Sequence, residues 1–310
     1  MISKLLSEEE RNRYNMKKTI FEGVATALIT PFKDGEVDFE AFGRIIDWQI
    51  ECGIDALVIC GTTGEASTLT DEEHQKVIAF AVERANKRIP IIAGTGSNDT
   101  AYALELTNAA CRSGVDAVLV ATPYYNKATQ RGLIEMYTAI ADQSTAPVIL
   151  YNVPSRTGVN IAPATYRILA EHPNIAAIKE ANGDISKIVE TMSYVHESLD
   201  LYSGNDDQIV PLMSLGAKGV ISVLSNIMPR ETKEIVSSFA RGDIKRSALL
   251  QYKYHEIIDA LFCEVNPIPV KAAMAGMGFC ENSLRLPLTV MSDDAMNRMY
   301  SVMRGLGLMN

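Results

Sequence analysis

Ile175-Ala-Ala-Ile-Lys-Glu-Ala181 is a short apolar run that ends in a lysine. Continuous apolar runs of this length are typical of parallel strands that are covered on both faces. We therefore predict a buried parallel strand here. Similar runs are found at residues 23–30, 56–61, 90–96, 117–123, 147–153, 201–206 and 219–225. The sequence thus predicts eight strands.

Amphipathic segments with helix-start signals lie between these runs. Asp38, Thr70 and Asp99 are expected N-caps, and Pro163 suits a first helical turn. Alternation of strands and helices predicts a parallel sheet, and eight such units favour closure into an α/β fold of the (β/α)8 TIM barrel type. The alternative is a doubly wound open sheet. That fold usually has a glycine-rich phosphate turn after the first strand, where this chain has ITPFKDGEVD at 29–38.

The chain divides into three predicted parts. Residues 1–18 form a polar N-terminal extension, residues 19–241 a catalytic barrel, and residues 242–310 a helical appendage. In the appendage the strand pattern stops, and helices are predicted at about 243–262, 266–278 and 292–307.

Composition excludes several classes of partner. The 310-residue chain has a net charge of −9 and no cluster of basic residues that could follow a phosphate backbone, so we expect no nucleic acid partner. Neither a membrane-spanning run nor a signal-peptide core is present, so no membrane partner is expected. An odd number of cysteines without a C-x-x-C pair indicates a reducing, cytoplasmic location. These cysteines are Cys52, Cys60, Cys111, Cys263 and Cys280.

Lys179 is the strongest catalytic candidate. A lysine at the end of a barrel strand should lie in the mouth of the barrel, where catalytic residues of this fold gather. Removal from water favours the neutral amine, which can attack a ketone to form a Schiff base. The alternative is a structural ion pair with Glu180, but strand alternation places Glu180 on the opposite face.

Other strand ends carry groups that could assist. Thr62 and Thr63 can bind a carboxylate through hydroxyls and nearby amides, or belong only to a tight turn. The phenols of Tyr124 and Tyr125 can transfer protons, or simply pack, and Tyr151 lies at the tip of the strand that precedes Arg156. Arg156 suits bidentate binding of a carboxylate, although most arginines lie on the surface.

The sequence predicts no metal and no cofactor site. Its histidines are too scattered for a metal centre, and it has no H-E-x-x-H, G-x-S-x-G or P-loop motif. The four histidines are His74, His172, His196 and His255.

Taken together, the strand ends resemble the pyruvate-dependent class I aldolases, the family of N-acetylneuraminate lyase, and within it the dihydrodipicolinate synthase branch. The resemblance covers about residues 20–305. It implies a lyase that condenses pyruvate with L-aspartate 4-semialdehyde to 4-hydroxy-tetrahydrodipicolinate, in diaminopimelate and lysine biosynthesis, without metal or cofactor. The matching motifs are Gly61-Thr-Thr-Gly-Glu65, Pro123-Tyr-Tyr-Asn126, Tyr151-Asn-Val-Pro-Ser-Arg-Thr-Gly158, Ile178-Lys-Glu-Ala181, Ser203-Gly-Asn-Asp206 and Gly219-Val-Ile-Ser222.

The resemblance also implies roles for the catalytic residues. Lys179 would form the Schiff base with pyruvate, and Tyr151 would be the acid and base beside it. Thr63 would connect Tyr151 to Tyr125, which in the family reaches in from a neighbouring subunit.

The same resemblance implies the substrate-binding residues and the assembly. Thr62 and Thr63 would hold the pyruvate carboxylate, and Arg156 the semialdehyde carboxylate. Gly204 and Ile221 would contribute backbone groups. The expected assembly is a homotetramer built as a dimer of dimers.

This sequence departs from the family pattern at two positions that are linked to inhibition by L-lysine. Asp71 and Tyr102 stand where lysine-inhibited bacterial relatives have a histidine and a glutamate. Loss of the glutamate removes a partner for the ammonium groups of the effector. We therefore expect weak inhibition or none. Other positions of that cleft are Ala66, Ser67, His74, Asn98 and Tyr124.

Two alternative functions are weighed against this one. The first is an N-acetylneuraminate lyase or a 2-keto-3-deoxy-sugar-acid aldolase of the same family, which generally lacks an arginine where Arg156 stands. The second is a non-catalytic binding barrel, which would be expected to lose Lys179 or Tyr151. Because all three residues are present, the synthase is favoured.

Overall fold

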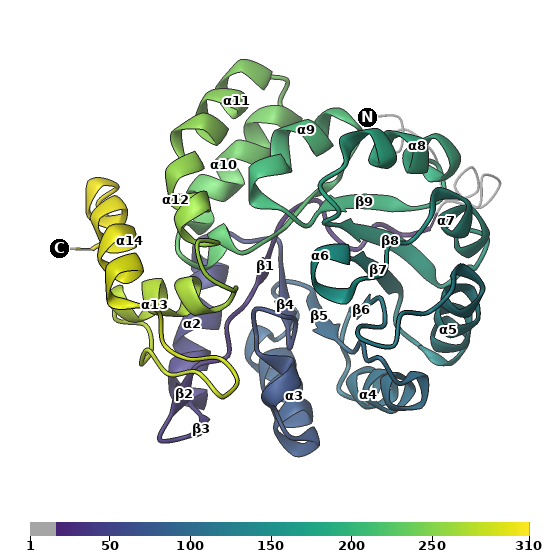
Figure 1. The fold of residues 1–310 in the computed structure, drawn as a ribbon, viewed down its shortest axis with the longest axis horizontal. Coiled ribbons are helices and arrows are strands. Elements are labelled where there is room, and N and C mark those ends of the chain that lie inside the picture. The colour runs from purple at the N-terminus through teal and green to yellow at the C-terminus, as the bar shows by residue number, and fades with distance from the viewer. Residues whose placement is uncertain (1–16, 310) are drawn as a thin grey trace.

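The computed structural model describes residues 17–309, so the predicted extension lies outside the described residues except for Lys17 and Lys18. Eight parallel strands close into a barrel in the order β1-β10-β9-β8-β7-β6-β5-β4, as predicted (Figure 1). The strands are β1 (Gly23–Ala27), β4 (Ala56–Ile59), β5 (Ile91–Gly94), β6 (Ala117–Ala121), β7 (Val148–Asn152), β8 (Ile175–Glu180), β9 (Asp200–Ser203) and β10 (Gly219–Ser222).

Every barrel strand ends before its predicted limit. The strand β1 ends at Ala27 rather than at residue 30, and β4 ends at Ile59 rather than at residue 61. The next residue, Cys60, has a φ of +53°, which lies outside the range of φ values found in β-strands. After most strands the first loop residues are still buried, so burial and apolar pattern cannot indicate where the hydrogen bonding stops.

A hairpin that was not predicted follows β1. Its strands are β2 (Phe32–Lys33) and β3 (Glu36–Val37), and Phe32 pairs with Val37. Between them Asp34 and Gly35 have positive φ values of 52° and 85°. An Asp-Gly pair is a common signal for such a turn, so the sequence did hold the information.

Helices cover the outside of the barrel, and their starts follow the predicted caps. Asp38, Thr70 and Asp99 each accept a hydrogen bond from the first turn, and Pro163 begins its helix. No helix within residues 17–309 is long and apolar enough to cross a membrane. The helices are α2 (Phe39–Glu51), α3 (Asp71–Ala85), α4 (Thr100–Arg112), α5 (Gln130–Gln143), α6 (Pro154–Thr157), α7 (Pro163–Leu169), α8 (Ile185–Val195), α9 (Ile209–Ser214) and α10 (Pro229–Ala240), with short 3-10 turns η2 (Ala66–Thr68), η3 (Asp206–Gln208) and η4 (Leu224–Asn226).

Alternation along the strands divides the core into two parts. One cluster fills the barrel interior and includes Ile149, Tyr151 and Ala177. The other lies between strands and helices and includes Leu150 and Ile178. Side chains on a strand point to opposite faces in turn, so Lys179, two residues after Ala177, points into the barrel.

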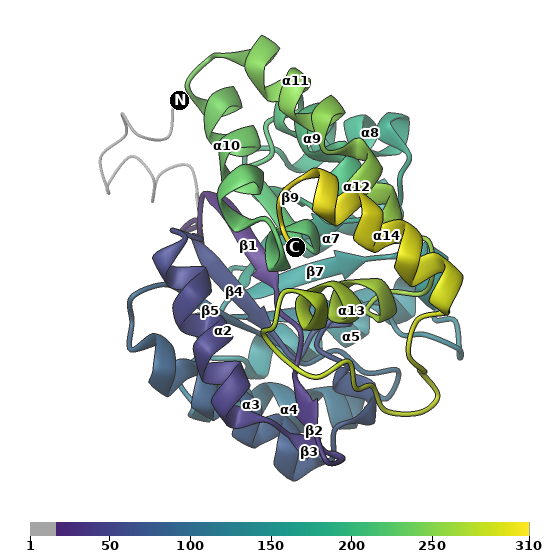
Figure 2. The same cartoon turned by 90° about the vertical axis from the view of Figure 1, so that its left-hand side faces the viewer.

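The appendage packs along one side of the barrel (Figures 1 and 2). It consists of α11 (Ile244–Lys253), α12 (His255–Ala260), α13 (Ile268–Gly276) and α14 (Asp293–Gly305). The single helix predicted over 243–262 is therefore two helices. They meet at Tyr254, whose backbone (φ −98°, ψ 7°) departs from helical values.

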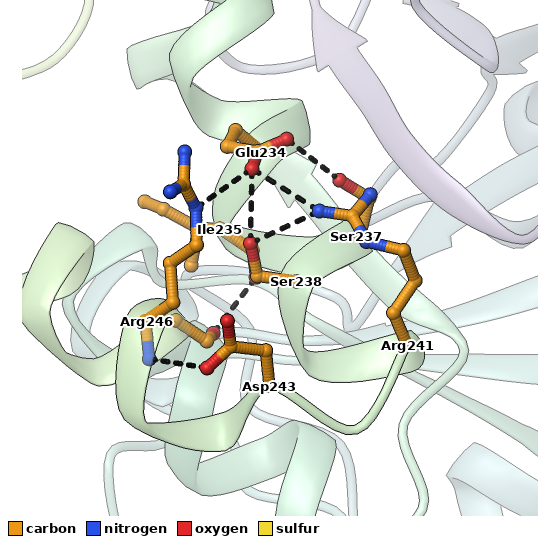
Figure 3. Close-up of polar contacts among 8 residues, drawn as sticks. Glu234, Ile235, Ser237, Ser238, Arg241, Asp243 and Arg246 are labelled. Atoms are coloured by element: carbon orange, nitrogen blue, oxygen red, sulfur yellow. Dashed lines mark hydrogen bonds and ion pairs between the residues drawn. The ribbon is translucent and has the colours of Figure 1, made fainter.

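A charged cluster joins α10 to α11 (Figure 3). Oε1 of Glu234 accepts hydrogen bonds from Arg241 at 3.1 Å and from Arg246 at 2.9 Å. The hydroxyls of Ser237 and Ser238 also donate to Glu234. All these partners come from the end of one helix and the start of the next, so the cluster fixes the turn between them.

Candidate active site

Lys179 and Tyr151 lie side by side in the barrel mouth. They are register partners on β8 and β7, and they are only 6% and 8% exposed. The amine nitrogen of Lys179 lies 4.2 Å from the centroid of the Tyr151 ring. Within residues 17–309, no carboxylate lies within ion-pair distance of this nitrogen. The Lys179 amine therefore packs against the Tyr151 ring in a site that is largely closed to water.

Glu180 is not the partner of Lys179, in agreement with the predicted alternation. Its carboxylate accepts hydrogen bonds from Asn152, from Tyr166 and from the backbone N–H of Asn182 on the outer face of the barrel. Burial raises the pKa of Glu180 to about 7, and the hydrogen bonds from Asn152 oppose this rise. The structural ion pair considered as an alternative is thus absent from the described residues.

The loop after β4 presents the two threonines. Backbone hydrogen bonds close it as a tight turn, from Gly64 to Gly61 at 3.0 Å and from Glu65 to Thr62 at 3.2 Å. Thr62 is exposed at the mouth, whereas Thr63 is 3% exposed. The tight turn that was the alternative interpretation of this motif is therefore present. It leaves the Thr62 hydroxyl at the barrel mouth.

A residue that the sequence did not indicate connects Thr63 to Arg156. Asn266, 6% exposed, donates from its side chain to the Thr63 hydroxyl at 3.0 Å. Its backbone carbonyl accepts a hydrogen bond from Arg156 at 3.2 Å. An Asn-Pro pair indicates a turn, but nothing in the sequence says that a loop from the appendage returns to the barrel mouth.

Gly204 and Ile221 lie at the ends of β9 and β10. A Cβ atom on Gly204 would come within 2.8 Å of the Ala181 Cβ and 2.9 Å of the Glu180 carbonyl oxygen, so this close approach requires glycine. The Gly204 N–H donates to that same oxygen at 2.7 Å. Ile221 belongs to the cluster inside the barrel.

Asp206 is a buried charged residue of the site for which no role was predicted. It is 2% exposed, and one of its oxygens accepts hydrogen bonds from the N–H groups of Val223 and Leu224, both at 2.9 Å. Burial raises its pKa, while the positive charge of Lys179 acts in the opposite direction. Asp206 thus anchors the loop after β10 and contributes negative charge near the amine.

Tyr125 is the one predicted catalytic residue that a single chain does not bring to the mouth. Its side chain is 90% exposed and its φ is +71°. A bulky residue held at positive φ is unusual and indicates a constrained loop. Neighbouring Tyr124 instead lines the cavity.

A cavity of about 480 Å³ opens at the mouth and extends toward α3 and α4. Its inner end includes Thr62, Tyr151 and Arg156. At its far end, the Tyr102 hydroxyl donates to Asp71 at 2.5 Å, which raises the pKa of Tyr102 to about 12. The outer lining residues are Ala66, Ser67, His74, Tyr102, Leu106 and Tyr124. In residues 17–309 no group of three or more metal-ligating side chains is found.

A closed parallel barrel with its polar site at the C-terminal ends of the strands defines the class of (β/α)8 enzymes. The family model described as the dihydrodipicolinate synthetase family matches residues 20–305. The chain belongs to this family.

Similar proteins agree with this assignment. A 4-hydroxy-tetrahydrodipicolinate synthase of Acetivibrio thermocellus is 50% identical over 293 residues, covering 94% of this chain and 100% of the relative. The dihydrodipicolinate synthase structure from Aquifex aeolicus is 48% identical with a TM-score of 0.91, covering 93% of this chain and 99% of that one. The chloride-inhibited dihydrodipicolinate synthase of Acinetobacter baumannii, solved with pyruvate, is 44% identical with a TM-score of 0.91, covering 94% and 100%.

Proposed function

We propose that this enzyme condenses pyruvate with L-aspartate 4-semialdehyde to give 4-hydroxy-tetrahydrodipicolinate, a step of diaminopimelate and lysine biosynthesis. Membership of the family and a 4-hydroxy-tetrahydrodipicolinate synthase relative at 50% identity support the reaction. The single observation that carries the mechanism is the buried Lys179 amine beside the Tyr151 phenol.

The chemistry begins at Lys179. Its neutral amine adds to the ketone carbon of pyruvate, water leaves, and an iminium forms. Loss of a methyl proton gives the enamine, whose carbon attacks the semialdehyde aldehyde. The amino group of the new chain then displaces Lys179 as the ring closes. The proton transfers at the imine are assigned to Tyr151, and the proximity of its ring to the Lys179 amine supports this assignment.

The polar groups around the amine suit two carboxylates. Thr62 and Thr63, with their backbone N–H groups, are assigned to the pyruvate carboxylate, near backbone groups of Gly204 and Ile221. Arg156 lines the cavity and is assigned to the semialdehyde carboxylate. The Acinetobacter baumannii relative was solved with pyruvate, which supports pyruvate as a substrate of this site.

Tyr125 completes the proposed proton relay only if another subunit supplies it. Its 90% exposure in one chain fits a side chain that inserts into a neighbour. We therefore infer a homotetramer with shared sites, in which Thr63 links Tyr151 to the Tyr125 of a second subunit. Tyr125→Phe and Lys179→Ala, each inactive alone, should recover part of the activity in mixed oligomers. Verified mixed oligomers without activity would contradict the shared site.

We also propose how the chain is divided and where in the cell the enzyme works. Residues 19–241 carry the chemistry and 242–310 buttress it, while the preceding extension has no assigned role. Five cysteines without a disulfide support a reducing, cytoplasmic location.

Regulation by L-lysine is proposed to be weak or absent. Tyr102 occupies the place of a glutamate, and its hydrogen bond to Asp71 already engages that carboxylate. The one carboxylate of this pair therefore lies at another position of the cleft and is already hydrogen-bonded, so it is less available to the ammonium groups of a diamine. Turnover measured against increasing L-lysine should stay above half at submillimolar concentrations, and half-inhibition there would contradict this proposal.

The reaction is tested by coupling turnover of pyruvate and L-aspartate 4-semialdehyde to the next reductase and following NADPH. We expect robust turnover that disappears in Lys179→Ala. A pyruvate adduct trapped by borohydride should appear in the wild type and not in that variant. Folded protein that forms the adduct without turning over the semialdehyde would exclude this substrate. A wild type without an adduct would exclude the imine mechanism.

A further inference from the structure

The ends of β7 and β8 carry two back-to-back pairs of side chains. Tyr151 is the register partner of Lys179, and Asn152 is the register partner of Glu180. Because strand side chains alternate, the first pair points into the barrel and the second points toward the helices. Whatever fixes the outer pair therefore also fixes the inner pair.

The outer pair is held by an unusually complete set of hydrogen bonds. The Asn152 amide donates to both Glu180 oxygens, at 2.9 and 3.1 Å. Tyr166 of α7 donates to Oε2 at 3.1 Å, and the Asn182 backbone N–H donates to Oε1 at 2.9 Å. All four contacts come from donors, an arrangement that suits the ionised carboxylate.

Asn152 cannot rotate freely to relieve this arrangement. Its Oδ1 accepts a hydrogen bond from the Ile161 N–H at 3.1 Å, and its amide also donates to Asn160 Oδ1 at 2.7 Å. Among these four contacts, only the Tyr166 hydroxyl can turn to accept a hydrogen bond from a protonated Glu180. Protonation of Glu180 would therefore disturb the contacts between the two strand ends.

The groups around Glu180 include no cation in the described part of the chain. β7 contributes Asn152, α7 contributes Tyr166, and Tyr137 of α5 lies behind Tyr166. From β9, Ser203 is the register partner of Glu180. Burial without a cation raises the pKa of Glu180 to about 7, so its ionisation changes in the neutral range.

We infer that Glu180 and Asn152 are positioning residues for the reaction at Lys179. Their hydrogen bonds on the outer face lock the strand register that places the amine against the Tyr151 ring on the inner face. The inference rests on the proposed function, because it assigns the pair to the imine chemistry of Lys179. It also predicts that ionisation of Glu180 contributes to the pH dependence of imine formation.

The test compares Glu180→Gln with Tyr137→Phe. Tyr137 is also fully buried outside the barrel, where it donates one hydrogen bond to the Val120 carbonyl. The rate of pyruvate adduct formation is measured by borohydride trapping and mass spectrometry from about pH 5.5 to about pH 8.5. Steady-state kcat and KM are measured over the same range.

Glu180→Gln should lower kcat and the trapping rate by about tenfold or more with little change in the KM for pyruvate, since small misplacements of a reacting group are costly. The change in kcat and trapping rate with pH that the wild type shows near neutrality should be absent in this variant. Tyr137→Phe should lower stability but keep both the rate and the profile. Equal losses in the two variants, or an unchanged profile in Glu180→Gln, would overturn the positioning role.

Tyr166→Phe keeps the inference testable if Glu180→Gln does not fold. It removes one of the four donors, so the ionised carboxylate loses support and this change in rate should move to higher pH. A change in rate that stays at the same pH would contradict the inference. A wild type that forms no adduct would instead overturn the proposed function, and the positioning role with it.

Discussion

Two charged clusters of this enzyme differ in their exposure to water. In the barrel mouth the side chains of Lys271 and Glu65 form an ion pair at 0% exposure. At the α10–α11 turn, Glu234 is 35% exposed and its arginine partners are 58–59% exposed (Figure 3). Charges in water interact weakly, whereas a buried charge that loses its partner is costly. Groups with strong effects on stability and chemistry should therefore be concentrated in the mouth.

The buried pair also joins two parts of the chain. Lys271 comes from α13 of the appendage, and Glu65 ends the loop that carries Thr62 and Thr63. The lysine amine also donates to the Thr30 carbonyl at 2.8 Å and lies 4.1 Å from the Phe32 ring centroid. Burial lowers the pKa of Lys271, and the charge of Glu65 opposes this change. The appendage thus holds the threonine loop in place.

The largest expected effect on stability comes from breaking this pair. Lys271→Met should lower the free energy of unfolding by about 3–5 kcal/mol, because Glu65 is left as a buried charge without its cation. The matched control is Lys76→Met, since Lys76 pairs with Glu72 at 62% and 76% exposure and should change little. Urea unfolding at one protein concentration measures both. Similar losses in the two variants would contradict the comparison.

The buried acid Glu180 should give a pH-dependent contribution to stability. Its pKa is about 7 in the folded enzyme against an ordinary value of 4.5, so the folded state holds a proton more strongly. Its contribution is therefore fully present below pH 4.5 and is lost as pH rises to about 7. The loss is at most about 3 kcal/mol at 1.36 kcal/mol per pKa unit. The wild type should lose stability over this window relative to Glu180→Gln, and parallel curves would argue against it.

Arg156 is exposed like the second cluster, but it lines the cavity at the barrel mouth, so its effect should appear in substrate binding rather than in stability. Arg156→Lys keeps the charge but loses the planar fork, so the KM for the semialdehyde should rise about 10- to 100-fold. The KM for pyruvate should change much less. Arg131→Lys is the control, because Arg131 is 87% exposed in a surface pair with Glu135. An equal rise in both KM values would show that Arg156 acts on the whole mouth rather than on one substrate.

Local features of the structure could be predicted well from the sequence, whereas contacts between residues far apart in the chain could not. Eight strands, the caps at Asp38 and Thr70 and the inward direction of Lys179 all follow from periodicity and local hydrogen bonding. Asn266 and the Lys271–Glu65 pair were not predicted, because each joins residues about 200 positions apart (|i−j| of 203 and 206). The path of the appendage over the mouth depends on packing that no local pattern records.

The smallest effect is expected at the exposed cluster. Glu234→Gln keeps an oxygen that can accept from Arg241, Arg246 and Ser238, but it removes the charge. The free energy of unfolding should fall by less than about 1 kcal/mol. High salt should remove most of this difference, because exposed charges are screened within about 10 Å at 0.1 M. Glu40→Gln, in the exposed helical pair with Arg44, is the matched control and should behave alike. A loss at Glu234 as large as that at Lys271 would mean that exposure does not separate the two clusters.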